Sequence, residues 1–262
     1  MKTKISFAFL TSALVGGLLS SCYVPEPAFE CTPATTEFAG HYTLVSGTAG
    51  GACAMYSGDL FRVQKYQAPG ASSASIAVLA TNMGKVTRVK NGDVLTGTGV
   101  FARVDPSDPN YAKESARGPL SSIAADSKGV CSATLAPADQ NLPAVSVHTA
   151  DFPKDGGVKN LPATHIKYDW KNFRFLNTAR FPGTIVSAQL DVTVDACQAT
   201  YDVEAIWPTV DCTTDEDCNP NANLDAGRVS GSGLSPDYAP KCDVDFGECI
   251  PTVSFDDLAK LQ

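Results

Sequence analysis

The fold of this chain is decided by residues 184–206, which have the sequence TIVSAQLDVTVDACQATYDVEAI. Apolar side chains take every second position over 186–194 and again over 199–205, with polar side chains between them. Because successive side chains of a strand point to opposite faces, this alternation predicts two strands, each with one buried and one wet face. Residues 195–196 suit a tight turn, so the stretch predicts an antiparallel hairpin.

Similar alternation recurs in shorter segments throughout residues 39–210. These segments are separated by Gly, Pro and Asn and cover 41–46, 60–66, 76–80, 94–104, 145–147 and 166–175. Within 94–104, Gly97 and Gly99 indicate a bend, a bulge or a close backbone approach. Repeated short strands with few helical patterns are typical of an antiparallel sandwich or barrel. We therefore predict an all-β fold with one sandwich or barrel domain over 39–210.

Two short helices are expected outside this pattern. Asp108 and Pro109 provide an N-cap and a first-turn proline, and Gly118 can end a helix within a long surface loop. Near the end of the chain, Ser254 begins a capping-box-like sequence. Apolar residues follow it at three-residue spacing and predict a short helix that packs back on the body.

The last part of the chain, 211–262, differs in composition from the strands. It contains CTTDEDC at 212–218 and CDVDFGEC at 242–249, joined by a loop rich in Asn, Asp, Gly, Ser and Pro. Because a segment of this length buries little apolar surface, cross-links must stabilise its fold. We predict a small disulfide-rich module that carries the terminal helix.

The start of this module, Cys212-x-x-Asp-x-Asp-Cys218, resembles small secreted disulfide modules of the whey-acidic and colipase-like kind. It is also similar to Cys-rich segments that end some bacterial surface lipoproteins. The chain lacks the adjacent Cys pair of the eukaryotic modules, so their inhibitor role is not implied here. Within the module we expect Cys212 to pair with Cys242 and Cys218 with Cys249.

The first residues carry the pattern of an export signal. Two lysines precede an apolar run over 5–19, and small residues follow up to Cys22. This run is shorter than the roughly 20 apolar residues that span a bilayer, so 1–21 is predicted as a signal peptide. The ending Leu19-Ser20-Ser21-Cys22 resembles the lipobox of gram-negative bacterial lipoproteins.

That resemblance implies cleavage before Cys22, a diacylglycerol on its sulfur and an acylated amino terminus. In the lipoprotein family an Asp after the lipidated Cys marks retention at the inner membrane, so Tyr23 implies the outer membrane. Residues 22–38 are rich in proline and are expected to form a flexible tether. The body would then be lipid-anchored and face the periplasm or the cell surface.

The net charge of the chain limits the classes of partner that it is expected to bind. The precursor has a formal charge of −8, and removal of a signal with two lysines and no acids makes it −10. An acidic chain without a basic stretch is not expected to bind nucleic acid. Membrane attachment would rest on the acyl chains, since the chain has no polybasic patch for anionic lipid.

The nine cysteines fit an exported lipoprotein. With Cys22 lipidated, eight are left for disulfides in an oxidising compartment. They are Cys31, Cys53, Cys131, Cys197, Cys212, Cys218, Cys242 and Cys249. Because Cys197 begins the second strand of the hairpin, we expect it to link the hairpin to a neighbour.

No recognised catalytic motif is present. The chain lacks Gly-x-Ser-x-Gly and His-Glu-x-x-His, and His41, His148 and His165 do not cluster with cysteines as in zinc sites. The same-face residues His165 and Asp169 are expected to lie without contact. We predict no cofactor and no enzymatic activity.

One weak calcium pattern lies in the C-terminal module. Oxygen-bearing side chains alternate there as hard cations require, at Asp215, Asp217, Asn219, Asn221, Asn223 and Asp225. An EF-hand starting at Asp217 would need Gly and Glu where Ala222 and Arg228 stand, so that motif fails. A solvated loop between disulfides is the favoured interpretation.

Three functions are open on these grounds. The body, from Gly40-x-Tyr42-x-Leu44 onward, is similar to β-rich lipoproteins that face the periplasm or the surface, which implies location and fold but no activity. We favour a non-enzymatic lipoprotein that binds an envelope protein or a small-molecule ligand. The alternatives are a lipocalin-like carrier with an apolar pocket and a lipid-anchored hydrolase with a carboxylate site.

Overall fold

The structure is a computed structural model that describes residues 29–83, 88–93, 97–102, 114–148, 158–225 and 230–261. Within these residues no helix is long and apolar enough to cross a membrane. Cys22 and the signal sequence lie outside the described residues.

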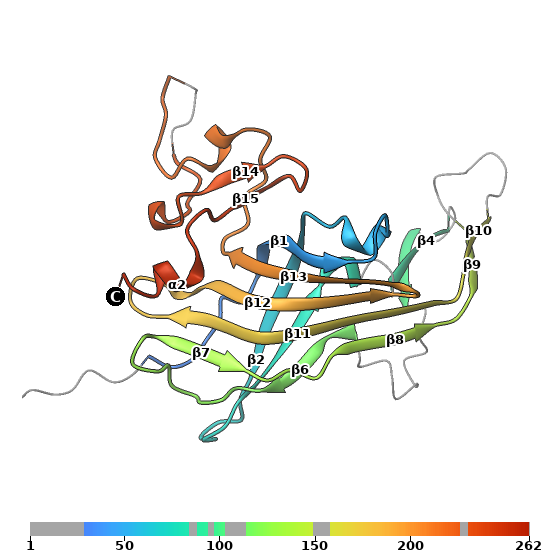
Figure 1. Cartoon of the computed structure of the whole chain (residues 1–262), viewed down its shortest axis with the longest axis horizontal. Coiled ribbons are helices and arrows are strands. Elements are labelled where there is room, and N and C mark those ends of the chain that lie inside the picture. The colour runs from blue at the N-terminus through green and yellow to red at the C-terminus, as the bar shows by residue number, and fades with distance from the viewer. Residues whose placement is uncertain are drawn as a thin grey trace, which may run out of the picture.

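One antiparallel sheet of nine strands forms the body (Figure 1). Its strands are β1 (Glu37–Gly47), β2 (Gly58–Tyr66), β3 (Ser75–Ala80), β6 (Ala116–Pro119), β7 (Val130–Ala133), β8 (Ala138–Leu142), β11 (Thr164–Asn177), β12 (Pro182–Val194) and β13 (Cys197–Ile206). They follow the order β6-β3-β2-β1-β13-β12-β11-β7, and β8 also pairs with β11. The predicted hairpin is confirmed as β12–β13, with Val194 opposite Cys197.

Smaller elements surround this sheet. They are the ribbons β4–β5 (Arg88–Asp93, Gly97–Ala102), β9–β10 (Val145–His148, Val158–Leu161) and β14–β15 (Lys241–Asp243, Glu248–Ile250), the 3-10 turns η1 (Ala52–Ala54), η3 (Asp215–Cys218) and η4 (Pro236–Tyr238), and the helix α2 (Phe255–Leu258). The predicted strand 94–104 thus corresponds to β5 in a separate two-stranded ribbon, with 94–96 and 103–104 outside the described residues.

The sheet curves so strongly that its two halves face each other across the core, yet it is not a closed barrel (Figure 1). Its outermost strands, β6 and β7, share no ladder. Two isolated bridges, Leu120–Ala133 and Arg117–Ala136, bring these edges together. The all-β antiparallel class is confirmed, and of the two expected architectures the closed barrel is excluded.

Aromatic side chains fill the space between the two halves. Phe61 of β2 lies 5.1 Å from Trp170 of β11 and 5.7 Å from Phe38 of β1, measured between ring centroids. Tyr42 and Tyr201 pack in the same core, at 5.5 Å. Rings that interdigitate in this way occupy the interior where a carrier would need an open pocket. The described core therefore gives the lipocalin-like alternative no support.

A second apolar cluster lies on the outer face of the sheet. Ile185 and Ile206 project from β12 and β13 and are fully buried. The C-terminal segment covers them with Tyr238, Phe255 and Leu258. The predicted terminal helix is confirmed as α2, with Ser254 accepting from the backbone N–H of Asp257. The disulfide-rich segment thus packs on the body through an apolar contact.

The prediction of a helix that ends at Gly118 is wrong for the C-terminal end of that helix. Ala116 begins strand β6, and Gly118 lies within that strand opposite Ile76 of β3. A Cβ at Gly118 would come within 1.8 Å of the Thr134 carbonyl oxygen, so the glycine permits a close backbone approach. Residues 108–113, where this prediction begins, lie outside the described residues.

Part of the segment expected as a tether is fixed to the body. Cys31 is buried in a disulfide with Cys131, and its N–H donates to Ile123 O at 2.7 Å. Glu30 forms a bridge with Ala124, and β1 already begins at Glu37. The described part of the expected tether, 29–38, is thus attached to the body, and 22–28 lie outside the described residues.

Candidate functional site

A β-bulge interrupts the long strand β11. Trp170 and Phe173 are both buried in the core although they stand three positions apart, a spacing that would place them on opposite faces of a regular strand. The register against β12 shifts between Lys171 and Arg174, and Asn172 adopts φ 51°. Asn tolerates this left-handed conformation better than most residues. The bulge changes which side chains face outward, so that Arg174 points to the outer face.

The same part of β11 has an open edge. Strand β8 pairs with β11 up to Tyr168, and β7 pairs with it from Phe173 onward. Between β7 and β8 the chain turns away, and Ala136 pairs with Arg117 instead. Residues 169–172 therefore have no strand partner recorded on this side among the described residues.

A hollow of about 1010 Å³ lies over this gap and continues across β12 and β13. We call it the bulge groove and define it by its polar lining residues Thr134, Asp169, Asn172, Gln189, Asp202 and Glu204. A neighbouring hollow of about 640 Å³ shares Asp169 and Lys171 and extends to Asp191 and Thr200. Bulges are frequent beside functional sites, where they redirect side chains.

Charged side chains of both signs line these hollows. Lys171 forms an ion pair with Asp191, which also accepts from the Thr200 hydroxyl at 2.7 Å. Burial opposes ionisation of Asp191, but the hydrogen bonds from Lys171 and Thr200 outweigh it and lower its pKa. Lys167 and Asp169 approach within 3.8 Å. The surface can thus both donate to and accept from a polar ligand.

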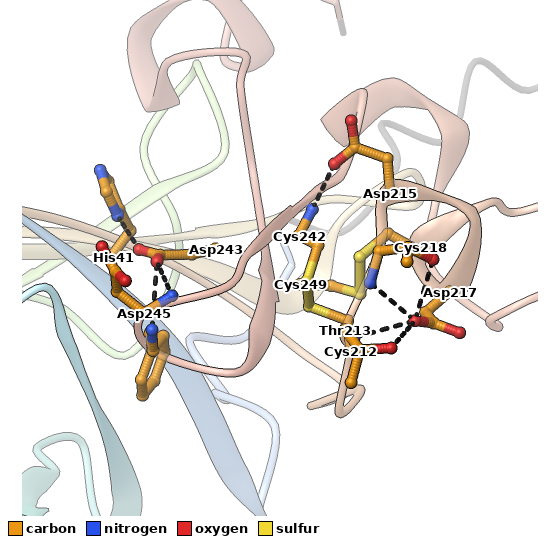
Figure 2. The surroundings of a disulfide bond; sticks show 12 residues. His41, Cys212, Thr213, Asp215, Asp217, Cys218, Cys242, Asp243, Asp245 and Cys249 are labelled. Carbon is orange, nitrogen blue, oxygen red and sulfur yellow. Dashed lines mark hydrogen bonds and ion pairs between the residues drawn. A yellow bond between two sulfur atoms is a disulfide. The ribbon is translucent and has the colours of Figure 1, made fainter.

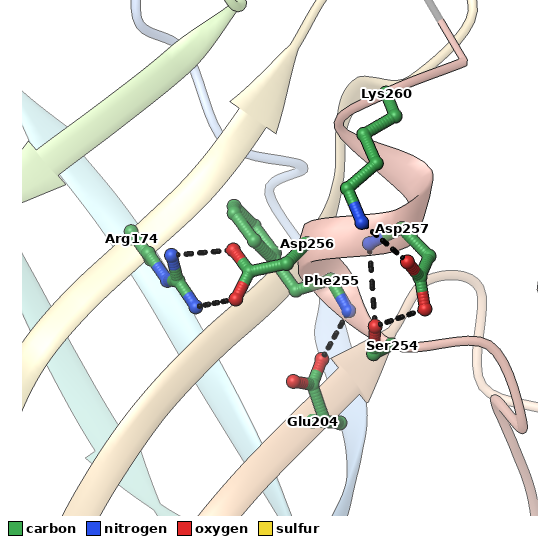
Figure 3. Close-up of polar contacts among 7 residues, drawn as sticks. All are labelled: Arg174, Glu204, Ser254, Phe255, Asp256, Asp257 and Lys260. Atoms are coloured by element: carbon green, nitrogen blue, oxygen red, sulfur yellow. Dashed lines mark hydrogen bonds and ion pairs between the residues drawn. The ribbon is translucent and has the colours of Figure 1, made fainter.

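Glu204 lies where the groove meets the C-terminal helix (Figure 3). Its Oε2 accepts from the backbone N–H of Phe255 at 3.2 Å. Arg174 donates two hydrogen bonds to Asp256, at 2.7 and 3.2 Å, and its guanidinium lies 4.5 Å from the centre of the Phe255 ring. Burial raises the pKa of Glu204 to about 7, against weaker lowering by the Phe255 and Ser187 hydrogen bonds.

The eight predicted cysteines form four disulfides. The pairs are Cys31–Cys131, Cys53–Cys197, Cys212–Cys242 and Cys218–Cys249. Both pairings expected within the C-terminal module are therefore observed, and Cys197 links the hairpin to η1 as expected. Among the described residues, the one converging group of metal-ligand types is the sulfurs of Cys212, Cys218 and Cys249, which the disulfides already use.

The weak calcium candidates are distributed along the loop and are used within it (Figure 2). Asp217 accepts from Thr213 and Thr214 in a capping box, and Asp215 accepts from the Cys242 N–H at 3.0 Å. The side-chain oxygen of Asn219 accepts from the N–H of Asn221. The amide of Asn223 donates to Glu216, and Asp225 joins no converging group of carboxylates among the described residues. The arrangement fits a hydrogen-bonded loop.

The three histidines lie in different places. His41 of β1 contacts Asp243 at 3.2 Å and so links the body to the C-terminal module (Figure 2). His165 of β11 contacts Asp139 of β8 at 3.0 Å, a cross-strand pair that the sequence does not reveal. His148 ends β9. No nucleophile is seen beside either pair among the described contacts.

The chain was compared with known proteins. A family model described as MlpA matches residues 36–208, which include β1, β13 and the strands between them. The chain is similar to the Myxococcus xanthus protein described as "Putative lipoprotein MlpA": the two are 26% identical over 181 residues, which cover 62% of this chain and 75% of the relative. No solved structure matches the chain significantly.

Proposed function

The chain belongs to the MlpA family, and on that premise we propose that it is an outer-membrane lipoprotein, anchored by lipid on Cys22, that binds an envelope protein without catalysis. The anchor is supported by Leu19-Ser20-Ser21-Cys22, and the outer-membrane address by Tyr23. The four disulfides are consistent with an oxidising compartment.

The binding role is carried by one observation, the interruption of β11 between Tyr168 and Phe173. A sheet edge with unpaired backbone groups can receive an extended peptide. Here the open edge borders the bulge groove, where Gln189 and Asp202 add side-chain donors and acceptors. The competing explanation is that the bulge has only a structural role and adjusts the twist of the strand. That explanation predicts no binding partner at the bulge.

Photo-crosslinking in the native host tests the groove. A photoreactive side chain at Gln189 is expected to give one discrete protein adduct, because this residue lines the groove. The matched control is Gln64, which is exposed on β2 and does not line the groove, and it should give none. The charge reversal Lys171→Glu should reduce the Gln189 adduct. Equal adducts at both positions, or none at Gln189, would reject the groove as a binding surface.

The anchor is tested at Cys22. Mass spectrometry of the mature amino terminus is expected to show cleavage before this residue and attached lipid. A Cys22→Ser variant should move from the outer-membrane fraction to the soluble periplasmic fraction. An unmodified Cys22, or a variant that stays in the membrane fraction, would contradict lipid anchoring.

One feature favours the hydrolase alternative. Glu204 has a raised pKa and shares the groove with Asp202, two residues away on the same strand face, as an acid and a base would in a glycosidase. However, Glu204 is engaged by the Phe255 N–H, which favours a structural role. Hydrolysis of chromogenic glycosides by the wild type, lost in both Glu204→Gln and Asp202→Asn, would establish the alternative.

A further inference from the structure

An apolar hollow of about 510 Å³ is lined in part by Leu261, near the C terminus that Figure 1 marks at one end of the molecule. Its rim is made by Phe29, by residues 125–127 and Gly129 before β7, by 178–180 between β11 and β12, and by Leu261. Phe29 and Leu261 are large apolar side chains that remain 46% and 43% exposed. Exposed apolar surface around a hollow indicates a contact with an apolar partner.

Hydrogen bonds to their own backbone carbonyls hold the two rim residues in place. The carbonyl of Phe29 accepts from the Ala125 N–H at 2.8 Å, and the carbonyl of Leu261 accepts from Arg180 at 3.1 Å. Arg180 also donates to both carboxylate oxygens of Asp237, so the charge beside the hollow is neutralised. The carboxylate of Asp126 accepts from backbone N–H groups of its own loop. Among the described residues, the Arg180 guanidinium is thus paired with a carboxylate, and the Asp126 carboxylate is turned to the N–H groups of its own loop.

The position of this end relative to the anchor identifies the partner. Cys22 precedes Phe29 by only seven residues, which span at most about 25 Å when fully extended. Lipid on Cys22 would therefore keep the hollow within reach of the bilayer. We infer that the end bearing Phe29 and Leu261 rests on the bilayer surface, with both side chains inserted among the lipids.

This inference depends on the proposed lipid anchor, which supplies the affinity. The apolar contact then has only to orient a protein that is already held at a high local concentration. A mature chain of charge −10 is repelled by anionic lipid, so the contact should be confined to this apolar end. The bulge groove, across β11–β13, would then remain accessible.

The test uses the full lipidated chain, reconstituted in phosphatidylcholine vesicles that contain brominated phosphatidylcholine. A Leu261→Trp variant is expected to lose at least half of its added fluorescence to the bromine. The matched control is Val244→Trp, because Val244 is 69% exposed on the β14–β15 turn, away from this end (Figure 1). Its fluorescence should change little. The native Trp170 and Trp207 give a common background that is measured in the parent chain.

A second pair of variants tests the contribution of the rim. Phe29→Glu, introduced into Leu261→Trp, should reduce quenching while the protein still floats with the vesicles. Met55→Glu, at an exposed residue of the η1 region, should leave quenching unchanged. If the protein floats with the vesicles but Leu261→Trp is not quenched, this inference alone is overturned. A blue-shifted but unquenched emission also overturns it, because that result would show the protein's own acyl chain in the hollow. Failure to float would overturn the anchor, and this inference with it.

Discussion

The carboxyl group of Glu204 is enclosed between the sheet and α2. Its pKa is raised to about 7 by burial, whereas an unfolded glutamate releases its proton near the ordinary value of about 4.5. The folded state thus holds more protons between these values, so stability falls as the pH rises through this window. Glu248, which lies in the C-terminal module, likewise has a pKa raised to about 7, by burial and then by Asp211.

We predict that the chain is more stable at pH 5 than at pH 8. Glu204→Gln keeps an acceptor for the Phe255 N–H and cannot ionise, so it should remove up to about 3 kcal/mol of this pH dependence. The free energy of unfolding, measured by denaturant titration at both pH values, checks this. The control Asp202→Asn changes an exposed carboxylate on the same strand and should leave the pH dependence intact. An unchanged slope in Glu204→Gln would show that this carboxyl is ionised in the fold.

Asn172 allows the bulge through its positive φ. Asn172→Gly should therefore be neutral or slightly stabilising, whereas Asn172→Val should cost about 1 to 2 kcal/mol because a β-branched residue is strained in this region. Thermal and denaturant unfolding of the two variants measures the difference. Lys171, next to it but without positive φ, supplies the control Lys171→Val. If Asn172→Val is no worse than this control, the bulge conformation is not held in solution.

At the scale of elements, α2 is too short to be stable alone and depends on what it buries. Phe255 and Leu258 are fully buried in the outer cluster, while Leu261 stays exposed. Leu258→Ala should lose about 2 to 5 kcal/mol through transfer and cavity terms. Leu261→Ala should lose little. Equal effects in chemical denaturation would contradict the packing of the helix on β12 and β13.

The bulge in β11 also shows how far an element can be inferred from its own residues. The apolar period of two holds through Ile166, Tyr168 and Trp170, then resumes at Phe173 after a spacing of three. That change of phase is a local signal, and it locates the bulge. The gap between β7 and β8 has no such signal, because it depends on Ala136 leaving β11 for β6.

At the scale of the whole molecule, two disulfides close long loops in the body. Cys31 and Cys131 are separated by 100 residues, and Cys53 and Cys197 by 144. Constraint of the unfolded chain by such loops contributes about 3 to 5 kcal/mol each. The double variant Cys31→Ala/Cys131→Ala should lose this much in denaturant unfolding. Protease should also cleave the variant before β1, where the wild type is expected to resist cleavage. Equal resistance in both would show that other contacts hold this segment.

The sequence by itself determined the all-β class, the β12–β13 hairpin and the terminal helix, and it gave the export signal as a prediction. These features depend on period-two alternation, capping residues and spacings within short segments, which act locally. Only the tertiary structure decided that β1 lies beside β13, that Glu204 meets α2, that His41 meets Asp243, and that Phe29 and Leu261 share one end. These partners are far apart along the chain, so their contacts depend on how the whole sheet curves and not on any local pattern.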